Sequence, residues 1–117
     1  ILYIDDDLRQ IRASAKVLKF RGHEVIEATN GLLGLEELLK GPDLVLLDFH
    51  MPRMDGLEFA RKVREDPTYS QYKDVPLIGI SNFPPEADKY LTISLEKPID
   101  WEGILFPLID KYTQKKS

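Results

Sequence analysis

The chain has 117 residues, 43% of them apolar, which suffices for one domain with a buried core. Its formal net charge of −4 argues against nucleic-acid binding, since domains that bind nucleic acid usually carry a basic patch. The lack of cysteine excludes a disulfide framework and thiol chemistry. No apolar run is long enough to cross a bilayer, and no signal peptide is visible. We therefore expect a cytoplasmic domain without membrane contact.

The first elements are a strand and a helix. Residues 1–4 form an apolar run, typical of a buried strand, and three aspartates follow it. Apolar residues then recur at helical spacing over residues 8–20. Asp7 is a suitable N-cap for this helix, and Gly22 is a suitable residue to end it.

The next three elements repeat this alternation. Residues 23–28 predict a second strand, and Asn30 can cap a leucine-rich helix that ends at Gly41. The unbroken apolar run of residues 44–47 is typical of a central parallel strand that is covered on both faces. This third strand leads directly into Asp48.

Beyond Asp48, residues 51–56 predict a turn and residues 57–64 predict a third helix. A loop is expected over residues 67–73. Residues 75–80 then predict a fourth strand, which is followed by Ser81.

The last part of the chain contains one unclear stretch. Over residues 82–90 the pattern indicates only a short helix that Pro84-Pro85 could start. A fifth strand is expected over residues 91–95, a turn at Lys97-Pro98, and a final helix to about residue 112. Trp101 and Phe106 are interpreted as packing residues of this helix.

Strands that alternate with helices predict an α/β fold with a parallel sheet and helices on both faces. Right-handed crossovers favour a doubly wound, five-stranded sheet in the flavodoxin-like order 2-1-3-4-5. In such a sheet, ligands bind beyond the carboxyl ends of strands 1 and 3. The polar residues at four strand ends should meet at this edge, namely Asp5, Asp6, Asp7, Asp48, Ser81, Glu96 and Lys97.

This set of side chains predicts phosphoryl chemistry. Carboxylates crowded in one cleft repel each other, and a cation relieves the repulsion. Ligands that are all oxygen atoms favour Mg²⁺, which Mn²⁺ or Ca²⁺ can replace. Asp48 is a suitable nucleophile, while the metal and Lys97 can stabilise the charge on a transferring phosphoryl group.

These motifs resemble the receiver domain of two-component response regulators over nearly the whole chain. The similarity lies in Ile4-Asp5-Asp6-Asp7, Leu46-Leu47-Asp48, Met51-Pro52-Arg53-Met54-Asp55-Gly56, Ser81 and Lys97-Pro98. It implies one receiver domain over residues 1–117, as part of a longer response regulator or hybrid kinase. It also implies that this domain is not a turnover enzyme.

The resemblance assigns a role to each residue of the site. Asp48 would be the phosphoacceptor, Ser81 the hydroxyl that moves toward the phosphoryl group, and Lys97 the lysine that contacts both. A cis peptide bond is usual at the Lys97-Pro98 step. The metal ligands implied are Asp5, Asp6, Asp48 and the backbone carbonyl of His50.

Three features depart from the family pattern. Ser94 stands where an aromatic residue is usual, and Asn82 stands where a small residue is usual. The stretch between Ser81 and Lys97 is also short, so the fourth helix is expected to be shortened or missing. These departures affect the expected output surface more than the phosphorylation site.

The implied partners are a histidine kinase or phosphotransfer protein as the phosphodonor, and an effector domain or protein as the receiver of the signal. Two alternatives stay open. One is a pseudo-receiver that binds its partner without phosphorylation. The other is a small phosphatase that uses an aspartyl-phosphate intermediate.

Overall fold

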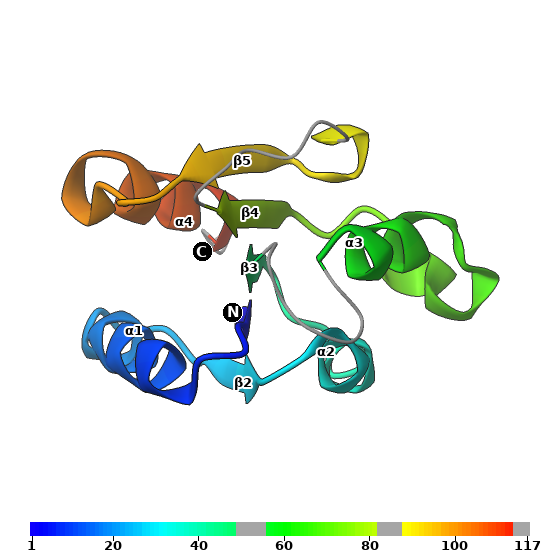
Figure 1. Ribbon diagram of the computed structural model, residues 1–117, viewed down its shortest axis with the longest axis horizontal. Coiled ribbons are helices and arrows are strands. Elements are labelled where there is room, and N and C mark those ends of the chain that lie inside the picture. Colours follow the sequence, from blue (N-terminus) through cyan, green and yellow to red (C-terminus); the bar gives the residue numbers. More distant parts are fainter. Residues whose placement is uncertain (49–55, 82–87, 114–117) are drawn as a thin grey trace.

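The computed structural model describes residues 1–48, 56–81 and 88–113. Strands and helices alternate along the chain, as the hydrophobic pattern predicted (Figure 1). The strands and α-helices are β1 (Leu2–Ile4), α1 (Leu8–Phe20), β2 (Ile26–Ala28), α2 (Gly31–Leu38), β3 (Val45–Asp48), α3 (Gly56–Glu65), β4 (Leu77–Ser81), β5 (Ile93–Glu96) and α4 (Phe106–Thr113).

The five strands form one sheet in the order β2-β1-β3-β4-β5, and all neighbouring strands are parallel. This is the predicted order. Leu2 pairs with Ile26 on one side and with Val45 on the other, so β1 lies between β2 and β3. The carboxyl ends of β1 and β3 are therefore neighbours, which places the residues that follow them at one edge.

Alternate side chains of the strands build two hydrophobic cores, one on each face of the sheet. Leu2 and Ile4 of β1 belong to the core that α2 and α3 cover, whereas Tyr3 belongs to the core that α1 and α4 cover. Figure 1 shows the two pairs of helices on opposite sides of the sheet. Because both of their faces are buried, the central strands β1 and β3 are almost entirely apolar rather than alternating.

Helix α1 has the ends that its sequence predicted. The Asp7 carboxylate accepts hydrogen bonds from the backbone N–H groups of Arg9, at 3.0 Å, and Gln10, at 3.3 Å. Gly22 follows the helix with a φ of 93°, a conformation that favours glycine. Local sequence therefore determines both ends of α1.

The predicted loop over residues 67–73 was wrong, because residues Pro67–Tyr72 form a 3₁₀ helix. Asp66 caps it by accepting a hydrogen bond from the backbone N–H of Thr68 at 2.9 Å, and Pro67 has a φ suited to a first helical position. The strands β2, β4 and β5 begin two or three residues later than predicted. The predicted turn at residues 51–55, Asn82 and Pro84-Pro85 lie outside the described residues.

Between β4 and β5, the helical structure among the described residues is a 3₁₀ turn at Asp88–Tyr90. Arg64 of α3 connects this segment to the chain before β4. Its guanidinium donates to the carbonyl oxygens of Lys73 and Val75, each at 2.7 Å, and of Tyr90 at 2.9 Å. It also lies 3.3 Å from the Thr92 hydroxyl. A side chain of α3 thus holds the connection into β5.

The last helix begins with a π-helical turn, Trp101–Leu105, which continues as α4. The Asp100 carboxylate caps the turn by accepting a hydrogen bond from the backbone N–H of Gly103 at 2.8 Å. Trp101 contacts the ring of Phe106 edge-on, with the centroids 5.5 Å apart. None of the helices in the described ranges has the length and apolar character needed to span a bilayer.

Candidate functional site

Three carboxylates meet at the carboxyl edge of the sheet. Asp5 and Asp6 follow β1, and Asp48 is the last residue of β3. Each offers an oxygen atom within 4.8 Å of the others. Asp5 and Asp48 are buried, with 3% and 7% of their surface exposed, while Asp6 is exposed. The prediction that these three residues converge is confirmed.

The Asp5 carboxyl group has an unusual environment. One of its oxygens accepts a hydrogen bond from the backbone N–H of Asp7 at 2.9 Å. Burial, together with the charge of Asp48 and a hydrogen bond to it, raises the pKa of Asp5 to about 7, although Asp7 and Lys97 act in the opposite direction. In the metal-free protein, Asp5 therefore keeps its proton up to a higher pH than an ordinary aspartate does.

The donor atoms of this cluster fit a hard divalent cation. All three groups offer carboxylate oxygen, the ligand type that Mg²⁺ and Ca²⁺ prefer. Burial, and after it the charge of Asp48, raises the pKa of Asp5, and a proton or a metal ion can neutralise this buried negative charge. The exposed position of Asp6 leaves one side of the cluster open to solvent.

Ser81 and Lys97 lie at the carboxyl ends of the two neighbouring strands. Ser81 ends β4 with 1% of its surface exposed, and Lys97 directly follows β5. The backbone N–H of Lys97 donates to the carbonyl oxygen of Ser81 at 2.8 Å, so the two strand ends are fixed together. The Lys97-Pro98 peptide bond is cis, as the resemblance implied. Lys97 lies close enough to Asp5 to lower its pKa.

A cleft of about 430 Å³ opens beside the cluster. Two of its lining residues contact Ser14: the Tyr3 hydroxyl and the Gln10 amide lie 3.4 and 3.3 Å from the Ser14 hydroxyl oxygen. The lining residues are Tyr3, Asp5, Gln10, Ile80, Lys97, Pro98, Ile99 and Trp101.

Trp101 therefore has a role that the sequence interpretation missed. It packs against Phe106 as expected, but it also forms part of the cleft wall. The sequence signal for this role was the position of Trp101, four residues after the predicted site residue Lys97. The carbonyl of His50, a predicted metal ligand, lies outside the described residues.

A family model described as the response regulator receiver domain matches residues 1–99. The chain is 41% identical over 92 residues to the sensor histidine kinase CheAY of Helicobacter pylori, a match that covers 76% of this chain and 11% of that protein. It is 31% identical over 116 residues to protein PilH of Pseudomonas aeruginosa, with 90% of each chain covered.

Solved structures of response regulators and of a chemotaxis protein are also similar to this chain. The chemotaxis protein CheY4 of Vibrio cholerae matches with a TM-score of 0.78 and 30% identity over 92% of both chains. The response regulator TrrA of Thermotoga maritima, solved in complex with Mg²⁺ and BeF, matches with a TM-score of 0.81 and 25% identity over 95% of this chain and 96% of that one. The chain spans only 5–11% of the length of CheAY and of two Dictyostelium discoideum hybrid histidine kinases that it matches.

Proposed function

Because this chain belongs to the response regulator receiver domain family of two-component systems, we propose that Asp48 accepts a phosphoryl group in a Mg²⁺-dependent reaction. Receiver domains are signalling domains rather than turnover enzymes, and this chain is one of them. The observation that carries the proposal is the meeting of Asp5, Asp6 and Asp48 within 4.8 Å, beside Lys97. These side chains would supply a nucleophile, metal ligands and a cation at one sheet edge.

In the proposed reaction, a carboxylate oxygen of Asp48 attacks the phosphorus atom of a phosphohistidine. A phosphorus–oxygen bond forms and the phosphorus–nitrogen bond breaks. The leaving imidazole nitrogen keeps the electron pair of that bond and takes up a proton. The products are an aspartyl phosphate on Asp48 and a neutral histidine on the donor.

The neighbouring residues have separate tasks in this proposal. Asp6 would bind Mg²⁺ directly, Asp5 would bind it through water, and Asp48 and the carbonyl of His50 would complete the protein ligands. Bound Mg²⁺ would neutralise the carboxylates and the charge on the transferring group. Lys97 would hold a phosphoryl oxygen as a point charge, and the Ser81 hydroxyl would donate a hydrogen bond to another.

The proposed donor is a histidine kinase or a phosphotransfer protein. Several relatives are named histidine kinases, including CheAY and two hybrid signal transduction histidine kinases of Dictyostelium discoideum. The proposed consequence of phosphorylation is a change at the surface around the end of β4, because the added charge of about −1.5 to −2 would draw Ser81 and Lys97 toward Asp48.

Phosphorylation can be tested with acetyl phosphate as a small donor. Wild-type protein incubated with acetyl phosphate and Mg²⁺ should gain the mass of one phosphoryl group. Excess EDTA should abolish the gain, and so should Asp48→Asn, which keeps the size of the side chain but removes the nucleophile. A wild-type protein that never gains mass, while a known receiver does so in the same tube, would refute the proposal.

A second candidate is an interaction module that works without phosphorylation. The observation in its favour is at β5, where Ser94 brings only a small side chain and its hydroxyl oxygen is buried without a hydrogen-bond partner among the described residues. A partner that binds equally well with and without Mg²⁺ and BeF would favour this candidate. A large change in that affinity would favour the phosphorylation switch.

A further inference from the structure

The outer surfaces of α1 and α2 are unusual for a domain that stands alone. Helix α2 and its C-cap expose three leucines, Leu32 by 52%, Leu33 by 42% and Leu39 by 57%. Single exposed leucines are common, but three on an eight-residue helix and its cap form an apolar surface that another surface can cover. The one exposed charge within α2 is Glu36. Neighbouring Glu37 is already paired with Lys40 at 2.7 Å.

Helix α1 has a basic exposed surface. It carries four exposed basic residues and no acidic residue, although the whole chain has a net charge of −4. None of the four forms an ion pair with a residue in the described part of the chain. The basic residues are Arg9, Arg12, Lys16 and Lys19.

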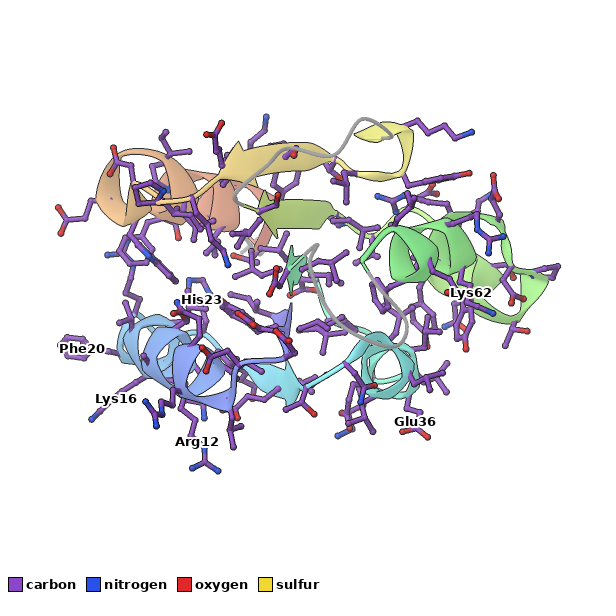
Figure 2. The ribbon with its side chains drawn as sticks, in the orientation of Figure 1. Arg12, Lys16, Phe20, His23, Glu36 and Lys62 are labelled. Atoms are coloured by element: carbon purple, nitrogen blue, oxygen red, sulfur yellow. The ribbon has the colours of Figure 1, made fainter. Side chains whose placement is uncertain are left out.

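These two surfaces border the same edge of the molecule. Strand β2 is the edge strand, with α1 on one face of the sheet and α2 on the other (Figure 1). Figure 2 shows that Arg12 of α1 and Glu36 of α2 both point away from the sheet, toward the space beyond β2. Lys16 points partly in the same direction. The edge is therefore flanked on one face by a basic helix and on the other by a helix with exposed leucines and one exposed glutamate.

We propose that a second copy of this chain covers this edge in a symmetric dimer. A two-fold axis parallel to the strands and just outside β2 exchanges the two faces of the sheet. It therefore places α1 of each copy against α2 of the other. Arg12 and Lys16 of one copy then face Glu36 of its partner, and the aliphatic stems of the basic residues cover the partner's leucines.

The symmetry explains why a second copy fits this edge. The contact between α1 and α2 occurs twice, so the charges are complementary at both places and the assembly closes as a dimer rather than a filament. The dimer also covers the edge strand β2, whose outer backbone groups would otherwise remain open to pairing.

The decisive experiment is a charge exchange followed by sedimentation equilibrium. Wild-type protein should show a monomer–dimer equilibrium that weakens with added NaCl. Arg12→Glu and Glu36→Arg should each weaken dimerisation by about tenfold, because each change replaces two attractive contacts by two repulsive ones. Arg61→Glu reverses an exposed charge on α3 and should leave the equilibrium unchanged.

Mixing the two variants makes the test independent of folding defects. In an equimolar mixture, the new glutamate of one variant faces the new arginine of the other, and the unchanged Glu36 faces the unchanged Arg12. The mixture should therefore form a heterodimer about as stable as the wild-type dimer. The proposal would be overturned if the wild type stays monomeric up to millimolar concentration. It would also be overturned if the mixture stays as monomeric as its two components. Neither outcome depends on whether Asp48 is phosphorylated.

Discussion

Asp5, which directly follows β1, and Asp48, the last residue of β3, bring carboxylate oxygens within 4.8 Å of each other. Because both groups are buried, one proton stabilises the pair in the absence of a metal. A divalent cation that binds here would compete with this proton.

The affinity for Mg²⁺ should depend on pH near neutrality. With a pKa of about 7, Asp5 is ionised at pH 8 and protonated at pH 5.5, where the metal must displace the proton. Titration calorimetry should show an affinity that falls by up to about tenfold per pH unit below 7. Asp5→Asn should bind Mg²⁺ more weakly and with a flatter pH profile. A wild-type affinity that is constant from pH 8 to 5.5 would contradict the raised pKa.

Asp5→Asn should also stabilise the metal-free protein at high pH. The pKa of Asp5 is raised on folding from 3.8 to about 7, so its contribution to stability is complete below pH 3.8 and is lost as the pH rises through 7. Asparagine keeps an oxygen for the backbone N–H of Asp7 and carries no charge. Urea unfolding at pH 8 with EDTA should show a gain on the order of 1–3 kcal/mol, allowing for screening by solvent.

Measuring the stability gained by Asp5→Asn at a second, lower pH provides the control. Near pH 4.5 the wild-type carboxyl is protonated in the folded state, so Asp5→Asn should there differ little from wild type. An equal gain at both pH values would show that the substitution acts through packing rather than through charge.

Asp7 and Asp6 are adjacent, but their substitutions should have different effects. The Asp7 carboxylate caps α1, so Asp7→Ala should lower the free energy of unfolding by about 1 kcal/mol. It should leave Mg²⁺ affinity nearly unchanged. Asp6→Ala removes a proposed metal ligand and should strongly weaken Mg²⁺ binding with little effect on the stability of the metal-free protein. If urea unfolding shows the larger loss of stability for Asp6→Ala, and calorimetry shows the larger loss of Mg²⁺ affinity for Asp7→Ala, then Asp6 is the helix cap and Asp7 the metal ligand.

Arg64 should be important for stability because its guanidinium bonds three backbone carbonyls on two separate segments. Arg64→Ala would leave these acceptors without their donor, at a cost of about 2–4 kcal/mol. The exposed residue Arg61 lies on the same helix, and Arg61→Ala should change the unfolding free energy by less than about 0.5 kcal/mol. Similar losses for the two variants would mean that the carbonyl contacts contribute little.

Local sequence was sufficient to predict most elements of the fold. Apolar runs and helical spacing indicated the five strands and the helices α1 to α3, since these patterns reflect which side of each element is buried. The caps Asp7 and Asn30 were also predictable, because each bonds to backbone groups only two or three residues away. The 3₁₀ helix at Pro67–Tyr72 was missed, although its Asp66-Pro67 start was present in the sequence.

The sequence by itself determined which polar residues follow each strand, and therefore which chemistry the sheet edge can carry. Only the tertiary structure decided how close Asp5 and Asp48 lie, and with that the raised pKa of Asp5, because this depends on burial and on contact between distant segments. The same holds for the Arg64 contacts and for the cleft beside Trp101. Local patterns encode strands, helices and caps, whereas distances between segments arise only when the whole chain packs.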